Sequence, residues 1–422
     1  MLSSARARAG AIAAGIDRSI AILALLSFIS QVGVSIMLPL LPLYAVAVGA
    51  TPAEVGLMVS AFSVTSTIGQ LASGFLSSRI SARRQMPLGQ AIYATGNFLI
   101  ATTTAALPLI TFRAMSGLGG GLTIIAERLY IARVTVQTRL AFTNGVVSAA
   151  GSSGSVLGPL LGAVLAVHDL RVPFVVVGCT ASIAGVAAFL FLPAERPAPV
   201  SAQMPLAATA LPESTELVPD LAGELPVVAE AQPGRWASIQ PLVRIGLWSV
   251  LFNASYGSWI TTFGPYSTQV LGLPQSFVQL FFAPFGLGAI ILGPILARLA
   301  DRTGRRRMVA FGTALVLTNT VALIVAAPVA ILYATALLAG GGLAAAGSSW
   351  FALLAVATEG GRRGRSFGLV SALSNLGVIA GASIVSTAWA TIGLGAGMVS
   401  ASVFLVLAIA SLALVPSDRS RG

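Results

Sequence analysis

Long apolar segments alternate with short polar ones along almost the whole chain. A membrane-spanning helix needs about 20 mostly apolar residues. Breaks at charged residues and at Gly/Pro clusters separate twelve segments of this kind. The first six are 19–44, 53–76, 86–106, 108–125, 142–167 and 172–192, and the second six are 239–271, 277–299, 308–326, 329–356, 366–390 and 393–415. The pattern predicts an all-α integral membrane protein with twelve transmembrane helices.

A polar segment divides the two sets of six. Residues 193–238 carry eight prolines and several acidic residues, so this segment cannot bury enough apolar surface to fold alone. We expect a linker between an N-terminal half at 19–192 and a C-terminal half at 239–415. Short tails at 1–18 and 416–422 complete the predicted organisation.

The two halves share glycines and arginines at one constant spacing. A shift of 223 residues (368 − 145) carries three glycines and four arginines of the first half onto residues of the same type. The pairs are Gly145 and Gly368, Gly154 and Gly377, Gly158 and Gly381, Arg79 and Arg302, Arg83 and Arg306, Arg84 and Arg307, and Arg139 and Arg362. We therefore predict two six-helix pseudo-repeat halves, related by an axis along the membrane normal.

Composition narrows the class of protein. Only 9% of the residues are charged, against about 25% in a soluble domain. One cysteine and one histidine exclude a disulfide framework and leave little for a zinc site. The chain has no nucleotide-binding glycine loop and no soluble catalytic domain. We expect no metal, no cofactor and no enzymatic activity.

The arginines indicate how the chain is oriented. The net charge is +11, and all but two of the 24 basic residues lie on the side of the termini and the linker. Arg171 lies on the other side, and Arg113 lies inside a predicted span. The positive-inside rule predicts cytoplasmic termini and a cytoplasmic linker. The charge thus reflects membrane topology, and we expect no nucleic-acid partner.

Basic tracts follow the second and eighth predicted helices. The tract at 301–307 reads Asp-Arg-Thr-Gly-Arg-Arg-Arg, whereas the copy in the first half has Ser78 and Ser81 in place of the acid and the glycine. Together with twelve spans in two halves and a polar central loop, these tracts resemble the major facilitator superfamily over essentially the whole chain. In that family the loop latches the cytoplasmic face in the outward-open state. The resemblance assigns the latch to Ser78, Arg79, Arg83, Asp301, Arg302 and Arg305; the alternative is that the arginines only set the topology.

The fifth predicted helix is rich in small residues. Gly145, Gly154, Gly158, Pro159 and Gly162 resemble the antiporter signature that drug:proton antiporters of the family carry on this helix. Missing side chains let two helices approach closely, and proline removes a backbone donor and permits a bend. Small-residue spacing alone is common in membrane helices, but the Gly-Pro pair makes the pattern more specific.

Two candidate charged residues lie in or at the end of the fourth predicted helix. Arg113 lies six residues into it, where a charge is costly unless it faces a cavity or a partner. It resembles the family's arginine on this helix, which lies by the cavity; the alternative is an arginine that bonds backbone carbonyls of the first helix. Glu127 is interpreted either as a proton carrier or as the acid that pairs with Arg79 or Arg83 to complete the latch, and we favour the latch.

The family architecture places a substrate cavity between the first, fourth, seventh and tenth helices. The candidate lining residues are mostly aromatic or uncharged polar: Gln31, Arg113, Asn253, Tyr256, Trp259, Phe282, Ser349 and Trp350. Such a cavity suits a hydrophobic or amphiphilic small molecule. The alternative is that the aromatic residues are helix packing or an interfacial belt.

We therefore predict a secondary transporter that exports hydrophobic or amphiphilic small molecules, such as drugs or metabolites, by proton antiport with alternating access. The alternative is a facilitator or importer of a neutral nutrient such as a sugar. The expected partners are a small-molecule substrate, protons and the lipid bilayer. The expected location is the bacterial cytoplasmic membrane, with the protein as a monomer. Proton coupling rests on the resemblance, because no acid lies at the middle of a predicted helix.

Overall fold

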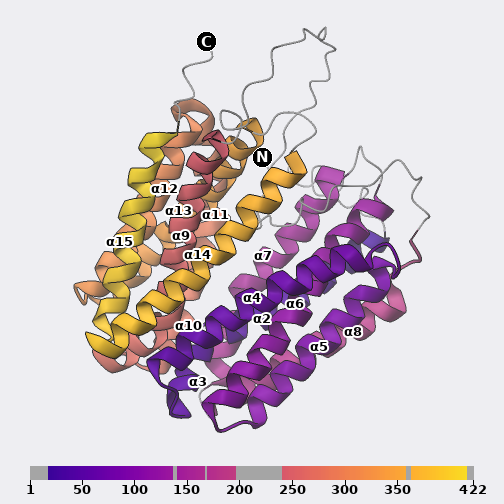
Figure 1. Cartoon of the computed structure of the whole chain (residues 1–422), viewed down its shortest axis with the longest axis horizontal. Coiled ribbons are helices and arrows are strands. Elements are labelled where there is room, and N and C mark those ends of the chain that lie inside the picture. The colour runs from indigo at the N-terminus through magenta and orange to yellow at the C-terminus, as the bar shows by residue number, and fades with distance from the viewer. Residues whose placement is uncertain (1–17, 136–139, 167–168, 196–239, 358–362, 416–422) are drawn as a thin grey trace, which may run out of the picture.

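The computed structural model describes residues 18–135, 140–166, 169–195, 240–357 and 363–415, and within these ranges it contains helices and no strand (Figure 1). The helices of the N-terminal half are α2 (Arg18–Met37), α3 (Leu41–Ala47), α4 (Pro52–Leu76), α5 (Ala82–Thr102), α6 (Ala106–Val134), α7 (Leu140–Leu165) and α8 (Val172–Phe191). Those of the C-terminal half are α9 (Gln240–Pro265), the π-helix η2 (Tyr266–Val270), α10 (Gln275–Leu280), α11 (Phe282–Thr303), α12 (Arg305–Ile324), α13 (Val329–Ala357), α14 (Arg363–Thr391), α15 (Gly395–Ser411) and the short 3-10 helix η3 (Leu412–Leu414).

Each of the twelve predicted spans corresponds to a helical segment, so the all-α membrane fold is confirmed. Nine of the segments in the described ranges are long and apolar enough to cross a bilayer by composition alone. Three spans are less regular than predicted. The first is divided into α2 and α3 next to Pro39 and Pro42, the seventh continues from α9 into η2 after Pro265, and the eighth is divided into α10 and α11. Proline lacks the backbone donor that a regular helix needs.

The fourth span is longer than predicted. The apolar pattern ends it at residue 125, but α6 continues to Val134. Its last two turns contain Glu127 and Arg128. We ended the predicted span before this charged pair, because charged residues usually mark the end of an apolar segment. Glu127 therefore lies inside a helix, seven residues before its end.

Equivalent helices pack in the same way in both halves. α2 packs on α7 as α9 packs on α14, α4 on α6 as α11 on α13, and α5 on α6 as α12 on α13. Glycines make the first of these pairs close. A Cβ added at Gly154 would approach the Phe28 carbonyl of α2, and one added at Gly377 would approach the Val250 carbonyl of α9. The shift of 223 residues thus corresponds to a repeated helix-packing arrangement.

The two halves lie side by side, and they contact each other away from the arginine-rich end (Figure 1). We use "arginine-rich end" for the end of the bundle that contains Arg79, Arg83 and Arg133 of the first half and Arg302 and Arg305–Arg307 of the second. Contacts between the halves join Thr67 to Asn375 near the middle of α4 and α14. Closer to the opposite end, Gly56 of α4 packs against Ser386 of α14, and Gly162 of α7 packs against Gln279 of α10.

Candidate functional site

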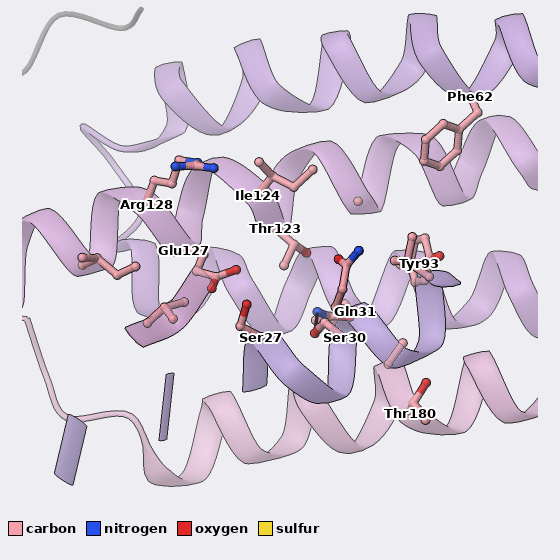
Figure 2. A pocket seen from close by; sticks show the side chains of 16 residues that line it. Ser27, Ser30, Gln31, Phe62, Tyr93, Thr123, Ile124, Glu127, Arg128 and Thr180 are labelled. Carbon is pink, nitrogen blue, oxygen red and sulfur yellow. Dashed lines mark hydrogen bonds between the residues drawn. The ribbon is translucent and has the colours of Figure 1, made fainter. Parts of the chain in front are cut away.

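A cavity of about 350 Å³ lies among the helices of the N-terminal half (Figure 2). It is lined from α2, α4, α5, α6, α7 and α8, and its lining mixes apolar side chains with hydroxyls and amides. The polar lining residues are Ser27, Ser30, Gln31, Gln90, Tyr93, Thr123, Glu127, Arg128 and Thr180. We call this space the N-half cavity. Two hydrogen bonds order its wall: Gln31 Nε2 donates to Ser155 Oγ at 2.9 Å, and Gln90 Nε2 donates to Ser30 Oγ at 2.8 Å.

One face of α6 carries both Arg113 and Glu127 and borders internal space. Glu127 follows Arg113 by fourteen residues, which at about 100° per residue places both near one helix face. At ~1.5 Å of rise per residue the two backbone positions are about 21 Å apart. Gly120 and Ile124 lie between them and line the N-half cavity. The arrangement separates a cationic and an acidic site along one helix.

Glu127 faces the N-half cavity and not the loop of the predicted latch. Its carboxylate lies next to Ser27 of α2, and the neighbouring Arg128 is the nearest positive charge (Figure 2). We favoured the interpretation in which Glu127 pairs with Arg79 or Arg83. In this structure the additional turns of α6 leave the carboxylate between α2 and α6, where no contact with Arg79 or Arg83 is described, so that pairing stays a prediction.

A different carboxylate, Glu195, meets the arginines of the first-half loop. Glu195 Oε2 lies 2.6 Å from Arg133 Nη1, and Glu195 Oε1 accepts a hydrogen bond from the Arg83 backbone at 2.5 Å. Arg133 also donates to the Ser77 carbonyl at 3.1 Å. Glu195 thus joins the ends of α6 and α8 to the start of α5. Sequence analysis missed it because Glu195 belongs to the polar segment that we assigned to the linker.

Glu195→Gln should lower the stability of the N-terminal half by about 1 kcal/mol, because the ion pair is partly solvated but also caps a backbone donor. The measurement is the thermal unfolding midpoint of the purified protein. Asp169→Asn is the control, since Asp169 is exposed and bonds only the nearby Arg171 backbone in the described structure. An equal shift in both variants would contradict the assignment.

The other predicted latch residues lie at the arginine-rich end without forming a described contact between the halves. Ser78 Oγ donates to the Phe75 carbonyl of its own helix at 3.0 Å. Arg79 and Arg302 are exposed. Arg305 is half-buried beside Arg306, whose Nη1 donates to the Val415 carbonyl at 2.7 Å. The Asp301 side chain is outside the described residues, so a latch between the halves stays a prediction.

Arg113 is buried where the two halves meet. Only 4% of it is exposed, and its guanidinium carbon lies 3.7 Å from the centre of the Phe62 ring. Its Nη1 donates to the sulfur of Met37 at 3.4 Å, and sulfur is a weak acceptor. Its Nε is buried and has no hydrogen-bond partner among the described residues. The alternative of a guanidinium satisfied by carbonyls of the first helix is therefore not what the structure shows.

A second cavity, of about 240 Å³, lies between the halves and includes Arg113. We call it the central cavity. Asn253, Tyr256 and Ile260 of α9 and Asn375 of α14 line it from the C-terminal half. The structure thus brings together three of the predicted cavity residues, Arg113, Asn253 and Tyr256, whereas Gln31 lines the N-half cavity.

The remaining predicted cavity residues belong to packed regions of the C-terminal half. Trp259 stacks on Phe263 at 4.4 Å and meets Phe282 edge-on at 5.8 Å. Trp350 donates to the Ile245 carbonyl at 3.2 Å and packs on Trp248. Neither tryptophan lines either of the two cavities, so the packing alternative describes these aromatic residues.

Ser349 also lies outside both cavities. It is buried, and its hydroxyl has no hydrogen-bond partner among the described residues. Ser349 lies on α13, as predicted, next to Trp350. Its side chain is buried in the C-terminal half. The predicted contribution of the tenth helix to the cavity is therefore not observed.

The glycines of the fifth helix pack against α2. An added Cβ would lie 2.6 Å from the Phe28 carbonyl oxygen at Gly154 and 2.6 Å from the Val32 carbonyl oxygen at Gly158. At Gly162 it would meet the Gln279 side chain of α10, in the other half, at 2.6 Å. Pro159 lies inside α7, and the surroundings of Gly145 are outside the described residues. This face of α7 thus contacts both α2 and the opposite half.

The comparison with known families agrees with this architecture. The family model described as Major Facilitator Superfamily matches residues 23–274 and 247–421, which together span nearly the whole chain. The chain belongs to the major facilitator superfamily. Members of this superfamily are transporters that bind small-molecule substrates within the membrane. The chain is therefore a multi-pass membrane transporter and not an enzyme.

Curated relatives within the superfamily are distant. The chain is 24% identical over 178 residues to an MFS-type transporter of Methanocaldococcus jannaschii, a match that covers 42% of this chain and 46% of the relative. It is 27% identical over 157 residues to the quinolone resistance protein NorA of Staphylococcus aureus, covering 37% of this chain and 40% of NorA. The chain thus matches less than half the length of these relatives.

Solved structures of the superfamily share the fold over nearly the full length. The human organic anion transporter MFSD10 (TETRAN) superposes with a TM-score of 0.62 at 19% identity, covering 94% of this chain and 99% of that one. An inward-facing bacterial homologue of the lysosomal transporter Spinster gives 0.71 at 13% identity, covering 95% and 97%. The nucleoside transporter NupG gives 0.73 at 12% identity, covering 94% and 100%. At these identities the likeness shows the fold alone.

Several residues of this superfamily member were not predicted to line a cavity. Phe62 lines both cavities, Tyr93 lines the N-half cavity, and Asn375 lines the central one. Asn375 Nδ2 also donates to Thr67 Oγ1 of α4 at 2.9 Å. A weak signal existed in the sequence, since Tyr93 and Asn375 are polar groups inside predicted spans. Nothing in the sequence indicated that they would face Arg113.

Proposed function

We propose that this chain exports hydrophobic or amphiphilic small molecules by proton antiport through alternating access. The observation that carries the proposal is the N-half cavity, a space within the bundle whose lining is part apolar and part polar and contains one carboxylate, Glu127. The partial likeness to NorA, which its name describes as a quinolone resistance protein, supports export of drug-like molecules.

Glu127 is the proposed proton carrier. Of the carboxylates whose side chains the structure describes, Glu54 caps the start of α4, and Asp169 and Glu195 lie outside the helices. Glu127 alone among these lies within the bundle and lines a cavity. A coupling carboxylate must exchange protons with water and respond to a substrate. Its place on a cavity wall suits both requirements.

The proposed orientation puts the arginine-rich end in the cytoplasm of a bacterial cell. The positive-inside rule supports this orientation. The described contacts between the halves extend from the middle of the bundle to the opposite end. The conformation is then inward-facing, and Glu127 lies on the cytoplasmic side of Arg113. We propose that the protein works as a monomer in the cytoplasmic membrane, because both cavities form within one chain.

One observation favours the second candidate, a facilitator or importer of a neutral nutrient. The N-half cavity contains more uncharged polar side chains than the sequence led us to expect, including Ser27, Ser30, Gln31 and Gln90. Hydroxyls and amides of this kind hydrogen-bond polar neutral substrates. An antiporter is driven by a proton gradient, whereas a facilitator moves its substrate only down the substrate's own gradient.

The deciding experiment uses the purified full-length protein in proteoliposomes. The vesicles are loaded with a panel of hydrophobic cations, anions and neutral metabolites, and release is followed with and without an imposed proton gradient. Gradient-driven release is the expected result for an antiporter. Movement only down the substrate's own gradient would contradict proton antiport and support the facilitator.

A further inference from the structure

Arg113 has no acidic partner in the described structure. Its polar neighbours with an electrostatic effect on it are the hydroxyls of Tyr93 and Tyr256, and the ion pair that the structure contains elsewhere joins Arg133 to Glu195. Burying a cation without a counter-charge is energetically unfavourable. Such a cost is recovered when an anion binds beside the guanidinium.

Further hydrogen-bond donors surround Arg113 from both halves. The Tyr93 hydroxyl of α5 is buried and lacks a partner among the described residues. The Tyr256 residue of α9 is 39% exposed and lines the central cavity. Asn253, one turn before Tyr256, adds an amide. Tyr93 lines the N-half cavity, so the central cavity combines one cation with two side chains, Tyr256 and Asn253, that can donate to an oxyanion.

The rest of the central cavity is mostly apolar, and its other polar residues, Ser63, Ser66 and Asn375, are uncharged. Its apolar lining comes from Leu38 in the link between α2 and α3, Leu41 of α3, Val59 of α4, and Ile260 and Val378 of the C-terminal half. Phe62 lies under the guanidinium and also lines the N-half cavity. No carboxylate is among the described residues that line the central cavity. A cationic ligand would therefore meet Arg113 without any compensating acid.

We propose that the central cavity binds the singly charged oxyanion group of an amphiphilic substrate, a carboxylate or sulfonate, between Arg113, Tyr256 and Asn253. This inference deepens the proposed function and rests on it, since it names the class of substrate. The apolar part of the substrate lies along Phe62 and the aliphatic lining. Because the donors come from both halves, the bound anion connects α6 to α9.

Binding of three matched probes tests the proposal without a proton gradient. The full-length protein in nanodiscs of neutral lipid is titrated calorimetrically at pH 7 with 2-naphthoate, 2-naphthamide and 2-naphthylmethylammonium, which share a ring and differ in charge. We expect 2-naphthoate to bind about tenfold more tightly than the amide, as for a hydrogen bond to a charged group, and the ammonium to bind more weakly than the amide.

Substitutions identify the site. Arg113→Gln should reduce 2-naphthoate binding to the level of the amide, and Tyr256→Phe should weaken it about threefold, as expected for one hydroxyl. The control is Arg244→Gln, which removes an exposed arginine of α9 with the same change in net charge and should leave the preference intact. If Arg113→Gln does not fold, the wild-type comparison and Tyr256→Phe still decide.

Equal binding of 2-naphthoate and 2-naphthamide by the wild type would overturn the proposal, and so would an anion preference that survives Arg113→Gln. These results are distinct from failure of proton antiport. An anion preference without gradient-driven release would remove the antiport mechanism but keep the anion site. Gradient-driven release of cations and neutral compounds without an anion preference would do the reverse.

Discussion

Glu127→Gln should abolish release driven by a proton gradient while leaving substrate binding within about twofold of the wild type. Glutamine keeps the size and hydrogen-bonding capacity of the side chain next to Ser27 but cannot carry a proton. The gradient then has no group through which to act on the cavity. The measurement is release from proteoliposomes with and without the gradient, together with binding of the transported compound.

The matched control is Glu195→Gln. It makes the same chemical change at the arginine-rich end, where Glu195 pairs with Arg133 outside both cavities. Transport in this variant should stay coupled to the gradient. Gradient-driven release that persists in Glu127→Gln would transfer the coupling role to another group and remove the main support for proton antiport through the N-half cavity.

Gly158→Ala should reduce transport at least about tenfold, and Gly158→Leu should abolish it. The added methyl group would lie 2.6 Å from the Val32 carbonyl oxygen, and a backbone atom cannot move aside as a flexible side chain can. The collision would push α7 away from α2 or hold the pair in a different crossing. The measurement is initial transport rate per folded protein, with folding checked by size-exclusion chromatography.

Gly347→Ala is the control for the glycine substitutions. Gly347 also lies within a helix, but an added Cβ at this position has no neighbour within 4 Å among the described atoms. The loss of helix flexibility is the same in both variants, and only the collision differs. Equal activity of the Gly158 and Gly347 variants would mean that close contact between α7 and α2 does not limit transport.

The polar side chains of the candidate site show what a sequence pattern leaves open. Arg113 was identified because a charge within an apolar segment is exceptional in itself. Asn253 and Tyr256 were identified because their spacing places them on one helix face. Trp259 and Trp350 were included as aromatic residues of the seventh and tenth helices, yet they pack within the C-terminal half. Aromatic residues satisfy the requirements of packing and of ligand binding equally well.

Glu127 shows a second reason for an error. Its charge and the adjacent Arg128 look like the end of a membrane span, so the apolar pattern ended the helix two residues earlier. The structure continues α6 to Val134, because a charged pair is tolerated within a helix when one member faces a polar cavity. The sequence contains the residues of that cavity, but they are distributed over six helices.

The sequence by itself determined the number of spans, the two-half organisation and the superfamily, because hydrophobic length and internal repetition are properties of the chain taken one segment at a time. Only the tertiary structure decided which carboxylate meets the loop arginines, which polar groups face Arg113 and where the halves touch. These are relations between segments far apart in sequence. They depend on helix rotation and crossing, which side-chain packing sets and a hydrophobic pattern does not encode.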